Sequence, residues 1–368
     1  MAKHGDLITD GGVTWKVIDT RVHGYIAETP NFYSRSGMFV VNNSPTTTSI
    51  TTPDKLLVNI NGHGYMATAT TININATSSW DSGDTGYATQ STRVGMDFYI
   101  YACEQEGDVP KWIISSNSTC PTGYTDSNSR KIGGFHCLCL SVGSIQDNSV
   151  SGLTTGAILP LSIWDLRHRP QSEPEGMVWV KGIGKWVDIY LASWSTEESK
   201  LVSKYRGTTA DGGSTIKFHG EKFVEEFGKV KKHLPMRDEF IVFAKGSNEL
   251  TNITGSKDKV YAGGWTDSAG RRMISSYGIE DCCGFLWQWT SDVCIYSGSS
   301  FSNSSVYSSS VDSQQYGQSY GSLCRALVGG RWSDSSACGS RCVDFGCVSS
   351  NVTANCGARA ASEPRKFE

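Results

Sequence analysis

The chain lacks any run of about 18 consecutive apolar residues, the length that spans a bilayer as a helix. Its start, MAKHGDLITDGG, also lacks the apolar stretch of a secretory signal peptide. The chain also has no large excess of either charge: it contains 33 Lys and Arg and 36 Asp and Glu, which gives a formal net charge of -3. Without a basic field, we expect neither nucleic-acid binding nor membrane insertion.

Long helical patterns are scarce, whereas glycine and aromatic residues are abundant, with 40 Gly, 11 Trp and 15 Tyr. This composition predicts a β-rich protein with many loops. The 368 residues, 38% of them hydrophobic, are enough for two or three packed units. Eight of the 12 Cys fall between Cys282 and Cys356, a distribution too clustered for a disulfide framework along the whole fold.

Three regions are expected along the chain. Residues 1–35 hold one short strand signal, VTWKVIDTRV, and are interpreted as an attachment segment without its own core. Residues 36–145 alternate apolar and polar positions, as in MDFYIYACE, and are interpreted as a β-sandwich. Residues 150–368 add two amphipathic segments, KFVEEFGKVKKHL and MRDEFIVFAKG, so the predicted fold class is α+β. Pro235 is expected in the first turn of the second helix.

The region between Asp281 and Ser362 contains no Lys and no Glu, although the rest of the chain uses both. Residues 301–321 are dominated by Ser and Tyr, as in an antibody paratope. Lys and Glu lose rotamer freedom when a partner immobilises them, which explains their absence from such a surface. The alternative is a solvated Ser-rich linker. Flanking Trp, Cys and Gly-Gly signals favour an ordered binding surface.

Small or polar residues recur at every second position near the end of the chain: Arg331, Ser333, Ser335 and Ala337, then Asn351, Thr353 and Asn355. In an extended segment this spacing places the side chains of each series on one face. Trp332 then points to the opposite face, where it can anchor the backbone in the core. The pattern predicts two rows of small, chemically unrelated side chains that face outward.

From Cys120 onward the chain resembles the variable proteins of diversity-generating retroelements. The resemblance rests on motifs that occur in the same order at similar separations: CPTGYTDSNSRKIGGFH, SIWDLRHRP, GMVWV, WVDIYL, HLPMRDEF, GFLWQW, GGRW, GSR and GAR. It implies a C-type lectin fold of the formylglycine-generating-enzyme type for the C-terminal domain. In that family the last segment, here about 329–360, displays ligand-contacting side chains on a fixed main chain.

The resemblance also implies roles for individual residues. Aligned from GGRW to GAR, the variable positions of a phage member fall on Arg331, Ser333, Ser335, Ala337, Asp344, Gly346, Cys347, Asn351, Thr353, Asn355 and Cys356. The retroelement mutates adenines in Asn codons, which can produce all of these residue types but never Lys, Glu, Gln, Met or Trp. Expected framework residues are Trp287, Trp289, Gly329, Gly330, Trp332, Arg341, Gly357 and Arg359, with the Trp287 and Trp289 rings beneath the surface. Cys282, Cys283 and Tyr296 are candidates for further variable positions.

The implied function is binding without catalysis and without a cofactor. The expected setting is a viral receptor-binding protein on a tail fibre or other virion surface, with a host-cell surface protein as ligand. The N-terminal region would attach to the virion, and assembly as a homo-oligomer is left open. Three alternatives remain: a copper oxidase of the same fold using Cys338 and Cys342, a zinc cluster of Cys338, Cys342, Cys347 and Cys356, and a calcium-dependent lectin.

Overall fold

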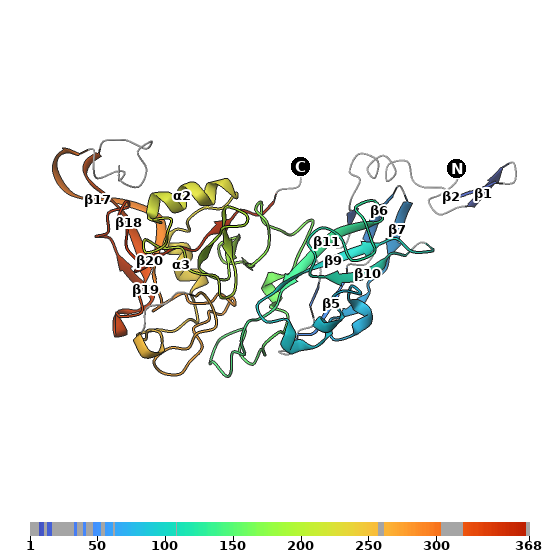
Figure 1. Ribbon diagram of the computed structural model, residues 1–368, viewed down its shortest axis with the longest axis horizontal. Coiled ribbons are helices and arrows are strands. Elements are labelled where there is room, and N and C mark those ends of the chain that lie inside the picture. The colour runs from blue at the N-terminus through green and yellow to red at the C-terminus, as the bar shows by residue number, and fades with distance from the viewer. Residues whose placement is uncertain are drawn as a thin grey trace.

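A computed structural model of the chain describes residues 47–365 except 53–55, 62, 108, 257–260 and 303–318, together with the backbone of four short strands before residue 47. Only the backbone is described at residues 57, 295–302 and 319–322. The molecule is elongated, with the sheets that precede β12 at one end and the sheet that contains β17 to β20 at the other (Figure 1). Side chains of the predicted attachment segment, 1–35, lie outside the described residues.

The part of the chain up to the end of β12 is called the first half here, and the part after it the second half. The strands of the first half form four sheets among the described residues, ordered β1-β2, β3-β6-β7, β4-β5-β8 and β10-β9-β11-β12. Their bounds are β1 Leu7–Asp10, β2 Val13–Lys16, β3 Tyr33–Ser34, β4 Val40–Val41, β5 Ser49–Thr51, β6 Leu56–Ile60, β7 His63–Ala67, β8 Thr71–Asn73, β9 Asp97–Cys103, β10 Lys111–Ser115, β11 Ser129–His136 and β12 Trp164–Asp165. Neighbouring strands in these sheets pair antiparallel. Short 3-10 turns follow β8 at Thr77–Ser79, Thr85–Ala88 and Gln90–Thr92, and another precedes β12 at Pro160–Ser162.

Strand β9 is buried on both faces and joins the two halves of the molecule. Phe98 and Ile100 pack into a core with residues of β6, β7 and β11. The alternate residues Tyr99 and Tyr101 pack on the opposite face against Trp186, which belongs to the second half. Because successive side chains of a strand point to opposite faces, one strand contributes to two cores.

The second half contains three sheets among the described residues, ordered β13-β14-β21, β15-β16 and β19-β18-β17-β20. Their bounds are β13 Met177–Val180, β14 Lys185–Asp188, β15 Ala192–Ser195, β16 Lys200–Ser203, β17 Trp287–Ser302, β18 Ser319–Gly329, β19 Gly339–Asp344, β20 Cys356–Gly357 and β21 Ala361–Ser362. With two α-helices in the part that the structure describes, the chain is a sheet-rich α+β protein.

Helices α2 (Gly220–Lys229) and α3 (Arg237–Phe243) confirm the two predicted amphipathic helices with shorter bounds. Lys231 has a left-handed φ of 59°, which an α-helix does not accommodate, so α2 ends before it. Pro235 does not lie in the first turn of the second helix, so that prediction was wrong. Met236 caps α3, and Pro235 precedes this cap. The backbone N–H of Met236 donates to Glu239 Oε2 at 2.9 Å and so starts the helix.

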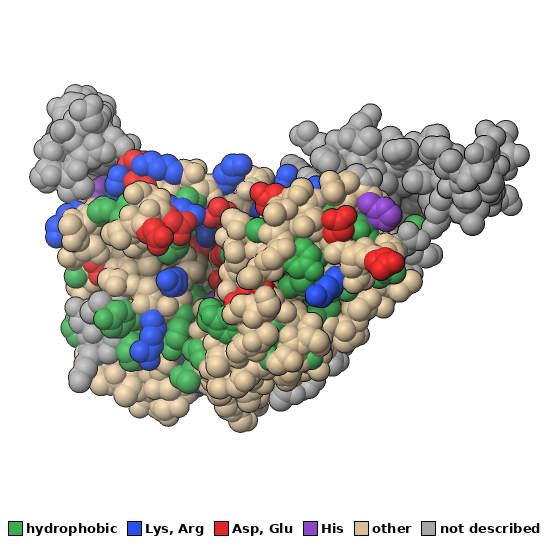
Figure 2. Space-filling view, turned by 45° about the vertical axis from the view of Figure 1, so that its right-hand side comes forward, with side chains coloured by type: hydrophobic (Ala, Val, Ile, Leu, Met, Phe, Trp, Pro, Cys, Tyr) green, Lys and Arg blue, Asp and Glu red, His purple; other side chains and the backbone are tan. Residues whose placement is uncertain are grey.

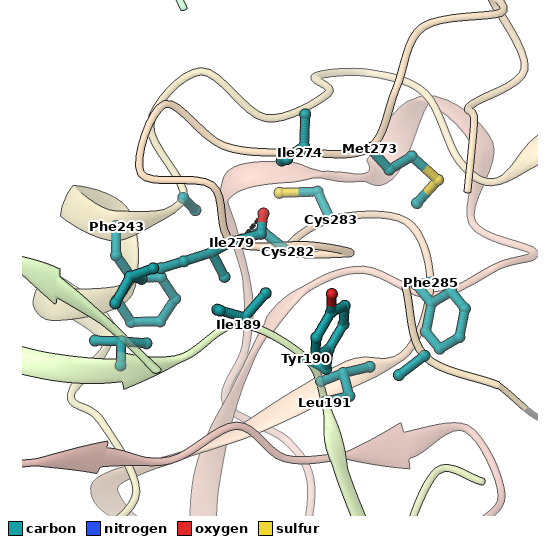
Figure 3. Packing of buried hydrophobic residues seen from close by; sticks show 14 of the residues in the cluster. Ile189, Tyr190, Leu191, Phe243, Met273, Ile274, Ile279, Cys282, Cys283 and Phe285 are labelled. Atoms are coloured by element: carbon teal, nitrogen blue, oxygen red, sulfur yellow. Dashed lines mark hydrogen bonds between the residues drawn. The ribbon is translucent and has the colours of Figure 1, made fainter. Parts of the chain in front are cut away.

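The largest core lies in the second half and includes residues of the first half such as Leu138 and Val150. On the face shown in Figure 2 charged side chains are a minority, as expected from 19% charged residues. Figure 3 shows Cys282 and Cys283 inside this core, close to Ile189, Ile274 and Ile279. None of the helices in the described ranges has the length and apolar character that crossing a membrane requires.

Candidate ligand-binding surface

A depression of about 720 Å³ opens over the sheet β19-β18-β17-β20. Eight of the eleven predicted variable positions line it: Arg331, Ala337, Asp344, Cys347, Asn351, Thr353, Asn355 and Cys356. Three parts of the chain supply these residues: the segment before β19, the last residue of β19, and the segment that runs from after β19 to the first residue of β20. The fold therefore gathers most of the predicted positions into one concave surface.

The main chain on both sides of the depression is held by the sheet. Leu327 pairs with Asp344 between β18 and β19, and Trp287 pairs with Cys356 between β17 and β20. Beyond β20, the buried guanidinium of Arg359 donates to the carbonyl oxygens of Asp188 and Ile189, at 2.7 Å and 2.5 Å. Arg359 is thus placed as a framework residue, because its hydrogen bonds tie the end of the displayed segment to β14.

Exposure differs among the predicted variable positions. Ser333, Ser335, Ala337, Asp344, Gly346 and Asn351 are exposed, whereas Arg331, Cys347, Thr353 and Asn355 are half-buried. Cys356 is only 4% exposed, so its prediction as an outward-facing residue was wrong. It starts β20, and its side chain packs into the core that contains Trp289. Cys356 therefore contributes to the floor of the depression.

The prediction of an extended strand over residues 331–337 was also wrong. Asp334 Oδ1 accepts a hydrogen bond from Arg331 Nε at 3.0 Å, and Asp334 Oδ2 accepts one from the Arg331 backbone N–H at 3.1 Å. The Asp334 N–H returns to the Arg331 carbonyl at 3.1 Å, and a 3-10 turn, Ser335–Ala337, follows. An aspartate that bonds its own neighbouring backbone in this way favours a turn over a strand. Ser333 and Ser335 are exposed in this turn, and they lie outside the depression.

The three framework tryptophans occupy three environments. Trp289 is fully buried in a core with Phe223 and Phe227, as predicted for a residue beneath the surface. Trp287 is half-buried and lines the depression, so its ring forms part of the surface and not a layer below it. Trp332 is half-buried and packs against the large core, while its backbone N–H donates to the Phe285 carbonyl at 2.9 Å.

The predicted framework glycines are explained by backbone geometry at two positions. Gly329 has φ 91° and Gly330 has φ 78°, both in the left-handed region. A Cβ at Gly329 would also lie 2.5 Å from the Cys282 carbonyl oxygen. Gly357 is buried at the end of β20, whereas Arg341 is exposed on β19, so a framework role for the Arg341 side chain was wrong.

Comparisons with known proteins identify relatives of this chain. Residues 41–165 match the family model described as the Mtd second domain, and this span ends where β12 ends. Over 278 residues the chain is 32% identical to a tail fiber receptor-binding protein of Bordetella phage BPP-1, covering 71% of this chain and 69% of that protein. The chain belongs to the major tropism determinant (Mtd) family.

Solved structures of Mtd variants extend the likeness over nearly the whole chain. The Major Tropism Determinant U1 variant superposes with a TM-score of 0.74 at 26% identity, over 98% of this chain and 92% of that one. The M1 variant gives 0.72 at 27% identity, over 92% and 86%. The likeness therefore includes the region before Cys120, in which no sequence motif of the family was found.

Two additional candidate positions in this Mtd-family chain were wrong. Cys282 and Cys283 are both 0% exposed, so neither can contact a ligand without unfolding of the core (Figure 3). The Tyr296 side chain and most of the Ser- and Tyr-rich stretch 301–321 lie outside the described residues. Sequence reasoning missed Phe345, which is 48% exposed and lines the depression. Its position between Asp344 and Gly346, two predicted variable residues, was the available signal.

The cysteines near the depression fall into two chemical types. Burial raises the pKa of Cys338 to about 12 and also raises the pKa of Cys342. Both thiols donate to backbone carbonyls, Cys338 to Arg331 at 3.3 Å and Cys342 to Ala337 at 2.7 Å. In contrast, hydrogen bonds from the Cys356 thiol and from the Asn351 amide lower the pKa of Cys347 to about 7.

The Cys338 and Cys342 thiols are thus each engaged with a backbone carbonyl oxygen. Within the described ranges, no three His, Cys, Asp or Glu side chains are placed so that they could hold a metal ion. All twelve cysteines are free thiols. The lining of the depression includes an ion pair between Arg331 Nε and Asp334 Oδ1 at 3.0 Å.

Proposed function

We propose that this chain is the receptor-binding protein of a phage tail fibre, and that the depression and its rim contact a protein on the host-cell surface. The observation that carries the proposal is the convergence of eight predicted variable positions from three stretches on one anchored surface. Membership of the Mtd family and the likeness to a tail fiber receptor-binding protein support it. The activity is binding, and no cofactor is required for it.

The architecture that we propose assigns one role to each region. Residues 150–368 form a C-type lectin domain of the formylglycine-generating-enzyme type that carries the variable segment, and residues 36–145 form a β-sandwich. In the latter assignment β12 is an added edge strand, since its pairing with β11 extends the sheet past residue 145. Residues 1–35 attach the protein to the virion, where it is located. The likeness to solved Mtd structures over 98% of the chain supports this division.

The small side chains at the surface set the expected strength of binding. A standard interface buries about 800 Å² on each partner, and its energy is concentrated in large anchors such as Trp, Tyr and Arg. The variable positions here are mostly Ser, Ala, Gly, Cys, Asn and Thr, so one copy should bind weakly or moderately. Several copies on one virion, or a homo-oligomer, would raise the effective affinity by roughly 10² to 10⁴.

The test is a triple variant, Arg331→Ala with Asp344→Ala and Asn355→Ala. We expect it to lose binding to cells that the parent protein binds, while its Tm changes by a few degrees at most, because none of the three side chains is buried. A matched control carries Lys181→Ala, Thr196→Ala and Glu197→Ala, all exposed and outside the depression. Retained binding, or a large fall in Tm, would contradict the proposed surface.

A further inference from the structure

A second cleft, of about 870 Å³, lies at the junction between the two halves of the molecule. One wall comes from the first-half sheet, through Tyr99, Lys131 and Trp164. The other wall comes from β16 and from the residues at the end of α2. It shares no lining residue with the depression, so a ligand here would be separate from the proposed receptor contact.

Not every cation of the cleft is paired with a carboxylate in a close ion pair. Six Lys and Arg and three Glu line it. Three of the cations have carboxylate partners: Lys200 with Glu173 and Glu198, Lys229 with Glu225 and Glu226, and Lys232 with Asp188. The other three, Lys131, Arg169 and Lys231, have no carboxylate within 4 Å among the residues that the structure describes. On the face in Figure 2, Lys, Arg and acidic side chains gather near the upper edge and the hollowed middle.

Two of the unpaired cations are held in place by aromatic rings. The Arg169 guanidinium carbon lies 5.3 Å from the centroid of the Trp164 ring, and Lys131 Nζ lies 4.8 Å from that of Tyr99. Lys131 also donates to the Ser118 carbonyl at 2.7 Å. Such contacts restrict a long side chain before a ligand arrives, so less rotamer entropy is lost on binding.

Polar groups in the cleft have unused hydrogen-bonding capacity. Arg169 Nε and Glu175 Oε2 are buried and make no hydrogen bond within the described part of the chain. Burial raises the pKa of Glu175. Buried polar atoms in native proteins are usually satisfied, so the Arg169 Nε donor points to an acceptor that the chain itself does not supply.

We propose that this cleft binds a phosphate group carried on a saccharide. The planar fork of Arg169 matches two phosphate oxygens, and Lys131 and Lys231 neutralise the remaining charge. The cleft is much larger than a free phosphate ion, and its volume lies in the range of small-molecule sites. The exposed amide of Gln171, which also lines it, is available to sugar hydroxyls.

The test is calorimetric titration of the full chain with mannose 6-phosphate, mannose and inorganic phosphate. Binding of mannose 6-phosphate without binding of mannose is expected. Arg169→Gln should weaken it by about tenfold or more, since a hydrogen bond to a charged group contributes about 1.5–3 kcal/mol. Arg169→Lys should recover only part of the loss, because a single ammonium cannot replace the fork. Inorganic phosphate that binds as tightly as the sugar phosphate would contradict the saccharide part of the proposal.

Matched variants keep this test decisive. Lys231→Gln changes an exposed side chain that carries no packing role, and it should weaken binding several-fold with no change in Tm. Lys181→Gln, in the turn between β13 and β14, is the control and should bind as the parent does. The triple variant of the depression should keep phosphate binding, which separates this proposal from the receptor contact. No binding at millimolar concentrations, or parent-like binding by Arg169→Gln and Lys231→Gln, would overturn the cleft assignment.

Discussion

At the scale of single residues, the thiol of Cys347 is the most reactive group that the surface offers. The neighbouring Cys356 thiol and the Asn351 amide stabilise its thiolate and bring its pKa to about 7. A thiolate, and not a thiol, is the nucleophile in alkylation. This side chain is half-buried at the depression, so a reagent reaches it from the side at which we place the ligand.

We therefore predict that the rate of alkylation of Cys347 by iodoacetamide rises about tenfold from pH 6 to pH 8, with its midpoint near pH 7. A lowered pKa means that the thiolate is present above pH 7 and is lost below it. Peptide mass spectrometry measures the rate, and Asn351→Ala should move the midpoint upward. Cys342 is the internal control, since burial raises its pKa and its reaction should begin only at higher pH. A Cys347 midpoint above that of Cys342 would contradict the assignment.

At the scale of elements, strand β17 carries two tryptophans, two residues apart, to which we assign different roles: one stabilises the fold and the other belongs to the proposed ligand surface. Trp289 is fully buried against the phenylalanines of α2, while Trp287 forms part of the depression. Burial of an entire Trp side chain contributes more to the folded state than partial burial does, because the apolar area removed from water is larger. The same strand thus supports the fold with one ring and places the other in the surface that we propose as the ligand contact.

For Trp289→Ala we predict a loss of about 3–5 kcal/mol in the free energy of unfolding. Trp287→Ala should cost about 1–2 kcal/mol but reduce cell binding by about tenfold, since a half-buried aromatic at an interface commonly anchors the partner. Urea denaturation and a cell-binding assay on both variants measure the two effects. Equal losses of stability would show that Trp287 is a core residue and would remove it from the ligand surface.

At the scale of the whole molecule, buried contacts join the two halves. His136 Nδ1 lies 3.0 Å from Asp97 Oδ1, and His136 Nε2 lies 3.0 Å from the hydroxyl of Tyr190, which belongs to the second half. Both His136 and Tyr190 are almost completely buried. Residues of the first half, among them Leu138 and Cys139, also pack into the core of the second half. The halves should therefore unfold together.

Tyr190→Phe tests this coupling. Removal of the hydroxyl leaves a buried His136 nitrogen without its partner, which should cost about 1–3 kcal/mol. We expect a single thermal transition, shifted downward, when tryptophan fluorescence and far-ultraviolet circular dichroism are recorded in parallel. Tyr205→Phe is the matched control, because its hydroxyl accepts a hydrogen bond from the exposed Arg206 side chain and its loss should leave the Tm nearly unchanged. Two separate transitions in the parent protein would refute the shared core.

Sequence patterns were sufficient where the physical signal is local. The amphipathic spacing of α2 and α3 was read correctly, and so was the abundance of short strands. The pattern at residues 331–337 led to a wrong prediction, because alternation of small residues is compatible with both a strand and a turn. The hydrogen bonds of the Asp334 carboxylate stabilise the turn. The prediction that Cys282 and Cys283 are variable positions was wrong for a similar reason, because residue type does not reveal burial.

The sequence by itself determined the family, the β-rich class and the set of side chains available for display, because motif order and composition are properties of the chain alone. Only the tertiary structure decided which of those side chains share one surface. Arg331, Asp344 and Asn355 belong to three stretches, and strand pairing among β17, β18, β19 and β20 brings them together. The cleft at the junction of the halves likewise depends on packing between distant segments, and pairwise contacts of that kind leave no periodic trace in the sequence.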